Sequence, residues 1–339
     1  MGFPSSQELK DLAQIDPEIN AMVNSGNSMA SFLPKEGDPE EVLRTLIPMM
    51  KANKPVIPSV PGIEESEAVY ETRDGASLKL CIYKPEDLSE DAPLLVWYHG
   101  GGGCIGFPEM NKPLLQQLVL QHGLVAIAPE YRLGPEFKFP VGIKDSWDAL
   151  KHIASHASEF GADLHKGFLL GGESNGGVTA AALALLARDE GLASPLTGVF
   201  LSAASFVPPH DVPEKYKDHY VSRFDPTCLN APPLNEFSKK VMDIGYAGDY
   251  TSPLFRAILW PTGHKDLPRT YFQSCGLDIN RDDSFIYQDI LNENAVETKL
   301  DVYPGGVHCF WLMFPQIGLS KKWRQDTNDA ISCLLQRSV

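Results

Sequence analysis

Two glycine-rich stretches, each directly after a short apolar run, constrain this chain more than any other feature of its sequence. The first is His99-Gly100-Gly101-Gly102 and the second is Gly172-Glu173-Ser174-Asn175-Gly176. A G-x-S-x-G pattern puts a serine on a sharp strand-to-helix turn, and an H-G-G-G pattern offers backbone N–H groups to a developing oxyanion. Composition alone predicts about 0.15 copies of the serine pattern and about 0.005 of H-G-G-G. Together they predict an acyl-transfer site.

Strand-like and helix-like segments alternate along most of the chain. The predicted strands are Leu94–Tyr98, Leu124–Ala128, Phe168–Leu170, Val199–Leu201, Tyr271–Gln273 and Lys299–Val302. The predicted helices are Ile143–His156, Gly177–Arg188, Phe285–Leu291 and Lys322–Leu335. A hairpin of Glu65–Thr72 and Ala76–Tyr83 around Asp74-Gly75 precedes them. This order predicts an α/β fold, a mostly parallel sheet with helices on both faces and its site at the carboxyl ends of the strands.

Two parts of the chain lie outside this alternation. Residues 1–60 are helix-prone pieces broken by prolines, and Phe206–Trp260 is rich in Pro, Tyr and charge with a helix expected at Leu234–Tyr246. We interpret them as a cap over the site, because insertions above a parallel sheet usually shape a binding site; the alternative is an extra helical layer without a substrate role. The expected organisation is an N-terminal cap segment (1–60), a catalytic domain (61–205 and 251–339) and a cap insertion (206–250).

Charge and cysteine content restrict the partners and the compartment. The net charge of −15 leaves no basic face for nucleic acid or an anionic membrane, and no apolar run approaches the ~20 residues of a membrane span. The six cysteines are scattered without C-x-x-C pairs or Cys/His ligand spacing. These features predict a cytoplasmic protein with reduced thiols and no metal site.

A serine nucleophile needs a base, and we look for it downstream of Ser174. Four histidines lie beyond the serine, of which His210, His219 and His264 fall in the expected cap or before a strand. His308 follows the strand Leu300–Tyr303 across Pro304–Gly306, a turn that we expect to be flexible enough to swing an imidazole over the sheet. His308 is therefore the predicted base.

The acid that orients this base is expected at the end of another strand. Asp278 directly follows Tyr271–Leu277 and is the predicted acid. Asp282 remains an alternative. Asp282 and Asp283 stand where a helix begins, where carboxylates are expected to cap the helix N-terminus.

Five stretches resemble the hormone-sensitive-lipase-like group of carboxylesterases in the α/β-hydrolase superfamily. They are His99–Gly102 with Gly106, Tyr131–Glu136 with Phe139-Pro140, Gly172–Gly177, Gly276–Asp283 and Gly306–Phe310. Tyr250–Leu254 is also similar to a family segment, and the resemblance covers roughly residues 65–337.

The resemblance implies an α/β-hydrolase fold with a helical cap and a serine esterase that cleaves short-to-medium acyl esters of small molecules. It implies Ser174 as nucleophile, Asp278 as acid and His308 as base. The backbone amides of Gly101, Gly102 and Asn175 match the oxyanion hole, and no cofactor or metal is needed. His99 is expected to brace its loop.

Departures from the family pattern leave the substrate open. Glu173 and Asn175 stand where many members have Asp and Ala, and Gly103-Cys104 replaces a common aromatic residue, which could widen the site or loosen the loop. Specialised hydrolases of secondary metabolism (a deacetylase, a lactonase or a product-releasing enzyme), an amidase or peptidase and a non-catalytic ligand receptor share this scaffold. The presence of His308 argues against the receptor. The sequence names neither the substrate nor the pathway, and it leaves a homodimer open.

Two cysteines lie close to predicted site residues in sequence. Cys104 is two residues past His99–Gly102, and Cys309 directly follows His308. One interpretation is that both are inert, buried apolar groups. The other is that a bulky adduct on either would displace the loop or the base, so that a thiol reagent slows turnover.

Overall fold

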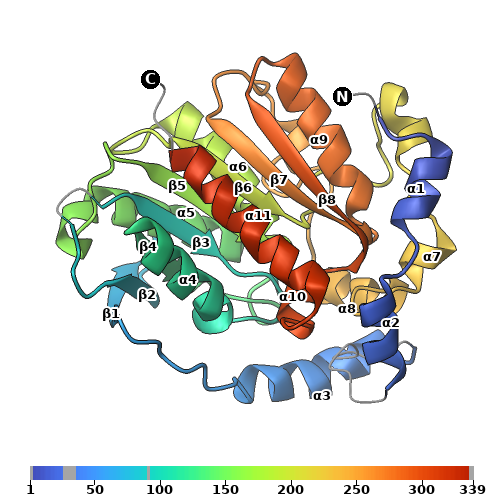
Figure 1. Cartoon of the computed structure of the whole chain (residues 1–339), viewed down its shortest axis with the longest axis horizontal. Helices are drawn as coiled ribbons and strands as arrows, with labels where there is room; N and C mark the ends of the chain where they lie inside the picture. Colours follow the sequence, from blue (N-terminus) through green and yellow to red (C-terminus); the bar gives the residue numbers. More distant parts are fainter. Residues whose placement is uncertain (1–2, 26–35, 90–91, 336–339) are drawn as a thin grey trace.

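An eight-stranded sheet forms the centre of the computed structural model, which describes residues 3–25, 36–89 and 92–335. The strand order is β1-β2-β4-β3-β5-β6-β7-β8 (Figure 1). The strands are β1 (Ile63–Glu71), β2 (Ser77–Pro85), β3 (Leu94–Tyr98), β4 (Val125–Pro129), β5 (Phe168–Glu173), β6 (Gly198–Ser202), β7 (Arg269–Leu277) and β8 (Thr298–Val307). β2 pairs antiparallel with β1 and β4, and all other neighbours are parallel.

Helices precede the sheet, alternate with its strands and follow it. The α-helices are α1 (Ser6–Leu12), α2 (Pro17–Asn24), α3 (Pro39–Ala52), α4 (Lys112–His122), α5 (Val141–Ser155), α6 (Asn175–Glu190), α7 (Pro226–Leu229), α8 (Glu236–Tyr246), α9 (Arg281–Glu293), α10 (Phe310–Met313) and α11 (Gly318–Leu335). The short 3-10 helices of the described residues are η1 (Pro108–Asn111), η2 (Ala157–Phe160), η3 (Glu214–His219) and η4 (Ala257–Leu259). No helix in the described ranges is both long and apolar enough to cross a membrane.

Alternate side chains of each buried strand serve two separate apolar layers. In β3, Leu94 and Val96 belong to the same apolar cluster as residues of α5, α6 and α9, whereas Leu95 and Trp97 belong to the cluster that includes residues of α4 and α11. Figure 1 shows α4 and α11 in front of the sheet. Because every residue of β3 is buried, the strand is apolar throughout and does not alternate between apolar and polar residues.

The structure confirms the predicted α/β fold. Each predicted strand and helix is present, with ends shifted by a few residues, as is usual when element ends are assigned. The flexible turn expected at Pro304–Gly306 is wrong, because β8 continues through it to Val307. Pairing with β7 is irregular between Cys275 and Leu277. This irregularity lets β8 continue through Pro304–Gly306.

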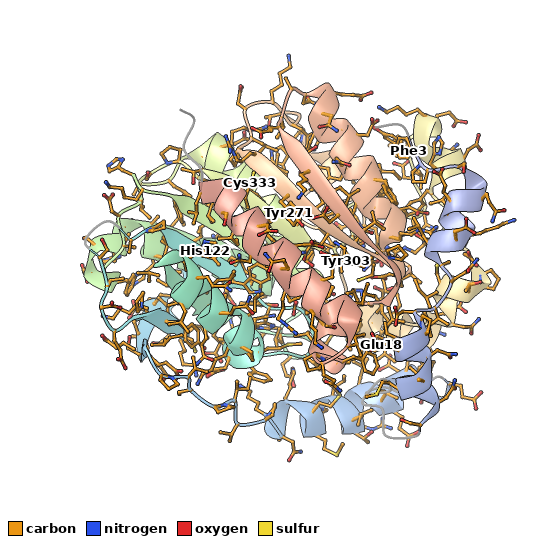
Figure 2. The ribbon with its side chains drawn as sticks, in the orientation of Figure 1. Phe3, Glu18, His122, Tyr271, Tyr303 and Cys333 are labelled. Carbon is orange, nitrogen blue, oxygen red and sulfur yellow. The ribbon has the colours of Figure 1, made fainter. Side chains whose placement is uncertain are left out.

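The connection between β6 and β7 carries η3, α7, α8 and η4, and the N-terminal helices lie around the same part of the molecule (Figure 1). α3 packs against α8. α2 is joined to the C-terminal helix, because Glu18 Oε2 accepts a hydrogen bond from the N–H of Gly318 at 2.7 Å (Figure 2).

Candidate active site

Ser174 lies on a tight turn between β5 and α6. Its backbone is strained, with a positive φ of 51° and ψ −121°, and its N–H donates to Ser202 O at 2.8 Å. The turn requires a glycine two residues later, because a Cβ on Gly176 would lie 2.0 Å from Tyr98 O. This conformation holds the Ser174 hydroxyl above the carboxyl ends of the strands and at the N-terminus of α6.

His308 and Asp278 reach Ser174 from the ends of two other strands. The Ser174 hydroxyl lies 2.9 Å from His308 Nε2, and His308 Nδ1 lies 2.6 Å from Asp278 Oδ2. Asp278 is 2% exposed and its other oxygen accepts from the N–H of Asn280 at 2.9 Å. With the proton on Nδ1, Nε2 is left as an acceptor for the serine hydroxyl. The three residues predicted from the sequence therefore meet in one hydrogen-bonded row.

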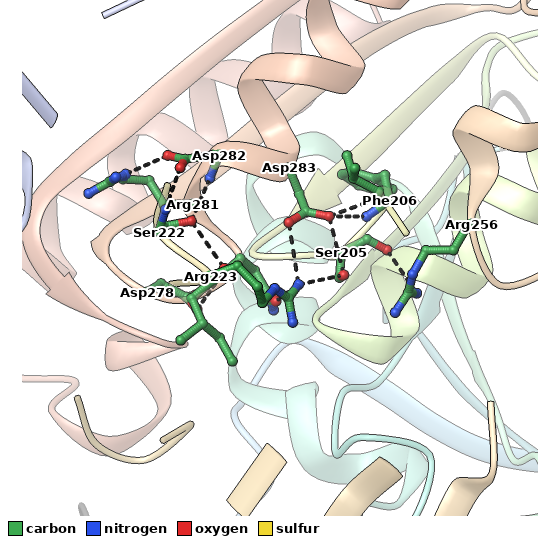
Figure 3. A network of polar contacts seen from close by, with 12 residues as sticks. Ser205, Phe206, Ser222, Arg223, Arg256, Asp278, Arg281, Asp282 and Asp283 are labelled. Atoms are coloured by element: carbon green, nitrogen blue, oxygen red, sulfur yellow. Dashed lines mark hydrogen bonds and ion pairs between the residues drawn. The ribbon is translucent and has the colours of Figure 1, made fainter. Parts of the chain in front are cut away.

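Asp282, the alternative acid, and its neighbour Asp283 point elsewhere (Figure 3). Asp282 Oδ2 accepts from the amides of Val221–Ser222 at 2.7 and 2.6 Å, and Asp283 Oδ1 accepts from those of Phe206–Val207 at 2.6 and 2.8 Å. Both lie in the first turn of α9, but the expected capping of α9 is wrong. The segment that folds over this turn has buried amides of its own, and the two carboxylates satisfy those instead.

Three backbone N–H groups close to Ser174 are available to bind a substrate. The N–H groups of Gly101 and Gly102 donate to no acceptor among the described residues. Asn175 is the first residue of α6, so its N–H has no partner within the helix. All three residues line the cavity that contains Ser174 and His308. Free amides at a helix N-terminus and a glycine turn can hold negative charge.

His99, the first residue of the glycine turn, is held in place by Tyr131. Its ring stacks on Tyr131 with centroids 4.4 Å apart, and the Tyr131 hydroxyl donates to His99 O at 2.8 Å. Burial lowers the pKa of His99 to about 4, so the ring is neutral at physiological pH. The bracing position expected for His99 fits these contacts.

The cavity over Ser174 has a volume of about 220 Å³ and mostly apolar walls. Met242 and Tyr246 of α8, together with Leu312 and Met313 of α10, supply much of the apolar lining. Polar lining comes from Asn175, Ser205, Lys239, Asp243, Arg256 and Asn280. Sequence reasoning missed Lys239 and Arg256, because their positions near the serine depend on how the segment between β6 and β7 folds back, and it missed Asn280, which lies two residues after Asp278.

Comparison with known proteins is consistent with this geometry. A family model described as the alpha/beta hydrolase fold matches residues 95–312, which include Ser174, Asp278 and His308. The chain belongs to the α/β-hydrolase family. The resemblance to its hormone-sensitive-lipase-like members is confirmed, and the chain is an esterase-type α/β hydrolase.

Individual relatives span most of this α/β hydrolase. An AB hydrolase superfamily protein of Schizosaccharomyces pombe is 34% identical over 83% of this chain and 82% of its own length. Versiconal hemiacetal acetate esterase of Dothistroma septosporum is 30% identical over 89% of this chain and 90% of its own. The crystal structure of vibralactone cyclase superposes with a TM-score of 0.82 and 29% identity, covering 99% of this chain and 98% of the other.

Glu173, beside the nucleophile, joins two sides of the α/β-hydrolase site. One carboxylate oxygen accepts from Asn111 Nδ2 and the other from Trp311 Nε1, both at 2.9 Å. The side chain is fully buried, and burial raises its pKa above the usual range for glutamate. Glu173 therefore connects η1, which follows the glycine turn, with α10, which follows His308. The sequence shows the Glu but not these two partners.

Many family members have an aromatic residue directly after the glycine turn. In this chain an aromatic ring from α8 lies beside the turn instead. A Cβ on Gly103 would lie 2.3 Å from the ring of Tyr246, which occupies that space from α8. Gly103 O also ties the loop to a neighbouring segment, because it accepts from the N–H of Gly134 at 2.7 Å. Tyr246 therefore fills the space beside Gly103, and the hydrogen bond to Gly134 supports the loop at this point.

The first two helices of this α/β hydrolase support the strands that carry Asp278 and His308. The N–H of Asp16 donates to Gly305 O at 3.1 Å, in β8 close to His308. Arg281 Nη1 donates to Leu9 O at 3.0 Å, close to Asp278. Sequence reasoning missed this role, because nothing in the N-terminal sequence points to a partner some 270 residues away.

The structure favours the inert interpretation of Cys104 and Cys309. Both are buried, and burial raises the pKa of Cys104 to about 12 and that of Cys309 well above its usual range. Cys333 is exposed near the end of α11 (Figure 2). We now expect N-ethylmaleimide at neutral pH to modify Cys333 and leave ester turnover unchanged, because buried thiols supply little thiolate.

This expectation is tested by mass spectrometry and activity assays on samples taken at the same times during the reaction with N-ethylmaleimide. Cys333→Ser is the control that lacks the exposed thiol. Activity that falls in step with labelling of Cys104 or Cys309 would contradict it.

Proposed function

We propose that this protein hydrolyses carboxylic esters with short-to-medium acyl chains through an acyl-enzyme on Ser174. The observation that carries the proposal is the hydrogen-bonded row of Ser174, His308 and Asp278, with 2.9 and 2.6 Å between its polar atoms. Esters of this size suit a mostly apolar cavity of about 220 Å³. The names of the relatives, which include an acetate esterase, support the same reaction class.

Each residue has one task in the proposed reaction. His308 takes the proton of Ser174 as Oγ attacks the ester carbonyl, and the amides of Gly101, Gly102 and Asn175 hold the oxyanion. His308 then gives this proton to the departing alcohol, which leaves the acyl group on Oγ. A water molecule, deprotonated by His308, releases the acid and restores the serine, while Asp278 keeps the imidazole in the productive tautomer.

The experiment that tests the function is a panel of 4-nitrophenyl esters with two to twelve acyl carbons, run beside an anilide. We expect turnover to be greatest for the shorter esters and to fall as the chain outgrows the cavity. Absence of turnover across the whole panel, in protein shown to be folded, would overturn the proposal.

A second candidate is a specialised metabolic hydrolase that uses the same triad. The relatives that favour it are versiconal hemiacetal acetate esterase and vibralactone cyclase, both named for reactions of particular metabolites. In this case turnover of simple esters is slow, and acetylated metabolites or hydroxy-acid esters are much better substrates. Chromatography of the products distinguishes hydrolysis from ring closure.

We also propose that residues 206–250 act as the cap of the site and that 1–60 support this cap. The insertion supplies Leu234, Met242 and Tyr246 to the cavity lining. The described part of residues 1–60 contributes no lining residue, but Leu43 of α3 packs on α8, since a Cβ on Gly245 would lie 2.6 Å from Leu43 Cδ2.

Leu43→Ala is therefore expected to raise KM for octanoate esters several-fold and to leave kcat/KM for acetate esters almost unchanged. Loss of a buried leucine side chain costs about 2–5 kcal/mol and here loosens the α8 wall, on which only long chains depend. Leu118→Ala is the matched control, because Leu118 is buried in α4 on the other layer of the sheet. Equal shifts in chain-length preference for both variants would contradict the cap proposal.

A further inference from the structure

A buried arginine without a carboxylate partner lines the cavity of Ser174. Arg256 is 1% exposed. Its Nη1 donates to Phe255 O at 2.6 Å and lies 3.5 Å from Ser205 O (Figure 3). Its Nε has no hydrogen-bond partner, and among the described residues no carboxylate forms an ion pair with it. A buried guanidinium in this situation is costly and is expected to have a partner.

The neighbouring charges do not supply that partner. Asp283 lies 3.4 Å from Arg223, which is itself buried, and also accepts from two backbone amides. Asp243 is bound by Lys239. Three cationic side chains, from Arg223, Lys239 and Arg256, and the carboxylates of Asp243 and Asp283 therefore lie in this region, and Lys239, Asp243 and Arg256 line the cavity itself. Arg256 carries the positive charge that is left over.

The contacts of Arg256 also determine which part of it is free. The rings of Phe255 and Tyr250 lie 3.9 and 4.4 Å from Arg256 Cζ, where they cover the guanidinium. Nη1 is engaged by backbone carbonyls. Nη2 forms no hydrogen bond with any described residue, whereas Nε is unpartnered but closed off from solvent. A guanidinium N–H group without a protein partner is a strong donor to a carboxylate oxygen.

We propose that Arg256 binds a carboxylate carried by the substrate, so that the natural ester is an acidic molecule with its anionic group at the arginine end of the cavity. The inference rests on the proposed ester hydrolysis at Ser174 and names its substrate class. Since the whole chain has a net charge of −15, long-range attraction does not favour an anion, and recognition depends on this local cation.

Two matched pairs of esters test the proposal on either side of the scissile bond. Mono-4-nitrophenyl adipate and 4-nitrophenyl hexanoate differ only in a terminal carboxylate on the acyl side. 6-Acetoxyhexanoate and hexyl acetate differ in the same way on the alcohol side. In one pair we expect the wild-type protein to prefer the acidic ester in kcat/KM by about 10- to 100-fold, the usual value of a hydrogen-bonded charge pair.

Arg256→Met is expected to abolish that preference, with kcat/KM falling much further for the acidic ester than for its neutral partner, because only the acidic ester uses the guanidinium. Arg256→Lys keeps the charge but replaces the planar guanidinium with a shorter, compact ammonium, and is expected to lose most of the preference. Arg188→Met is the matched control, since Arg188 also donates to backbone carbonyls but lies outside the cavity lining.

Two results would overturn the inference while leaving ester hydrolysis intact: no preference in either pair, or an equal loss on both members in Arg256→Met. Failure of the wild-type protein to cleave any ester would instead count against the proposed function. In that case titration calorimetry with Ser174→Ala and Ser174→Ala/Arg256→Met tests binding of the carboxylate by Arg256 independently of turnover. We expect the first variant to bind mono-4-nitrophenyl adipate at least about tenfold more tightly; equal affinities would overturn the role of Arg256.

Discussion

Replacing Ser174 by alanine is expected to lower kcat on 4-nitrophenyl acetate by about 10⁴- to 10⁶-fold, with the fold intact. The nucleophile is lost, and only the amides and the cavity remain to assist attack by water. His308→Ala is expected to cost a similar factor, and the double variant little more, because the two residues act in the same step. Steady-state kinetics and circular dichroism of the three variants measure this.

Ser202→Ala is a suitable control for the serine substitution. Ser202 is a fully buried serine of β6 whose hydroxyl donates to Gln273 Oε1 at 3.1 Å, outside the cavity lining. Its substitution is expected to reduce stability by about 1 kcal/mol and leave kcat within severalfold of the wild-type value. Multiplied losses in the Ser174/His308 double variant would contradict a shared step.

Asp278→Asn is the second large expected effect, about 10⁴-fold in kcat. An asparagine side chain can present its NH₂ to His308 Nδ1, which stabilises the tautomer with the proton on Nε2, and this tautomer cannot accept the proton of Ser174. The 2.6 Å contact between Nδ1 and Oδ2 means that no rearrangement is needed for this exchange. Activity over a range of pH, beside labelling of Ser174, measures the loss.

Asp282→Asn is the matched control for the acid. Asp282 is fully buried, like Asp278, but its oxygens accept from backbone amides of the cap and from Arg281 Nε at 2.7 Å. We expect this variant to unfold at lower urea concentrations and to retain most of its kcat at low temperature. A loss of 10³-fold or more in kcat of a folded Asp282→Asn protein would contradict the assignment of Asp278.

Local patterns were sufficient to predict the sheet and the row of side chains at its edge. Apolar runs such as Leu94–Tyr98 predicted strands, and the residues that follow four of these strands gather at one edge because parallel strands end together. His99, Ser174, Asp278 and His308 each come directly after β3, β5, β7 and β8. The proposed chemistry therefore depends on positions that are easy to read in the sequence.

Features that depend on long-range packing could not be predicted. The orientation of Asp282 and Asp283 toward the cap, the ring of Tyr246 beside Gly103 and the unpaired Arg256 all depend on where Phe206–Trp260 folds over the sheet. That segment has little periodicity, so its path is fixed by tertiary contacts. The turn expected at Pro304–Gly306 was wrong for a related reason, because β8 pairs with β7 on either side of it, at Tyr303 and Val307, and the N–H of Asp16 donates to Gly305 O.

Covalent labelling by a fluorophosphonate tests the central claim most directly. The reagent phosphonylates a serine only where a base activates the hydroxyl and amides stabilise the charged oxygen. We predict one label per chain, located by peptide mass spectrometry on Ser174, absent from Ser174→Ala and greatly slowed in His308→Ala. Labelling of Ser174→Ala at the wild-type rate, or no labelling of the folded wild-type protein, would contradict the account.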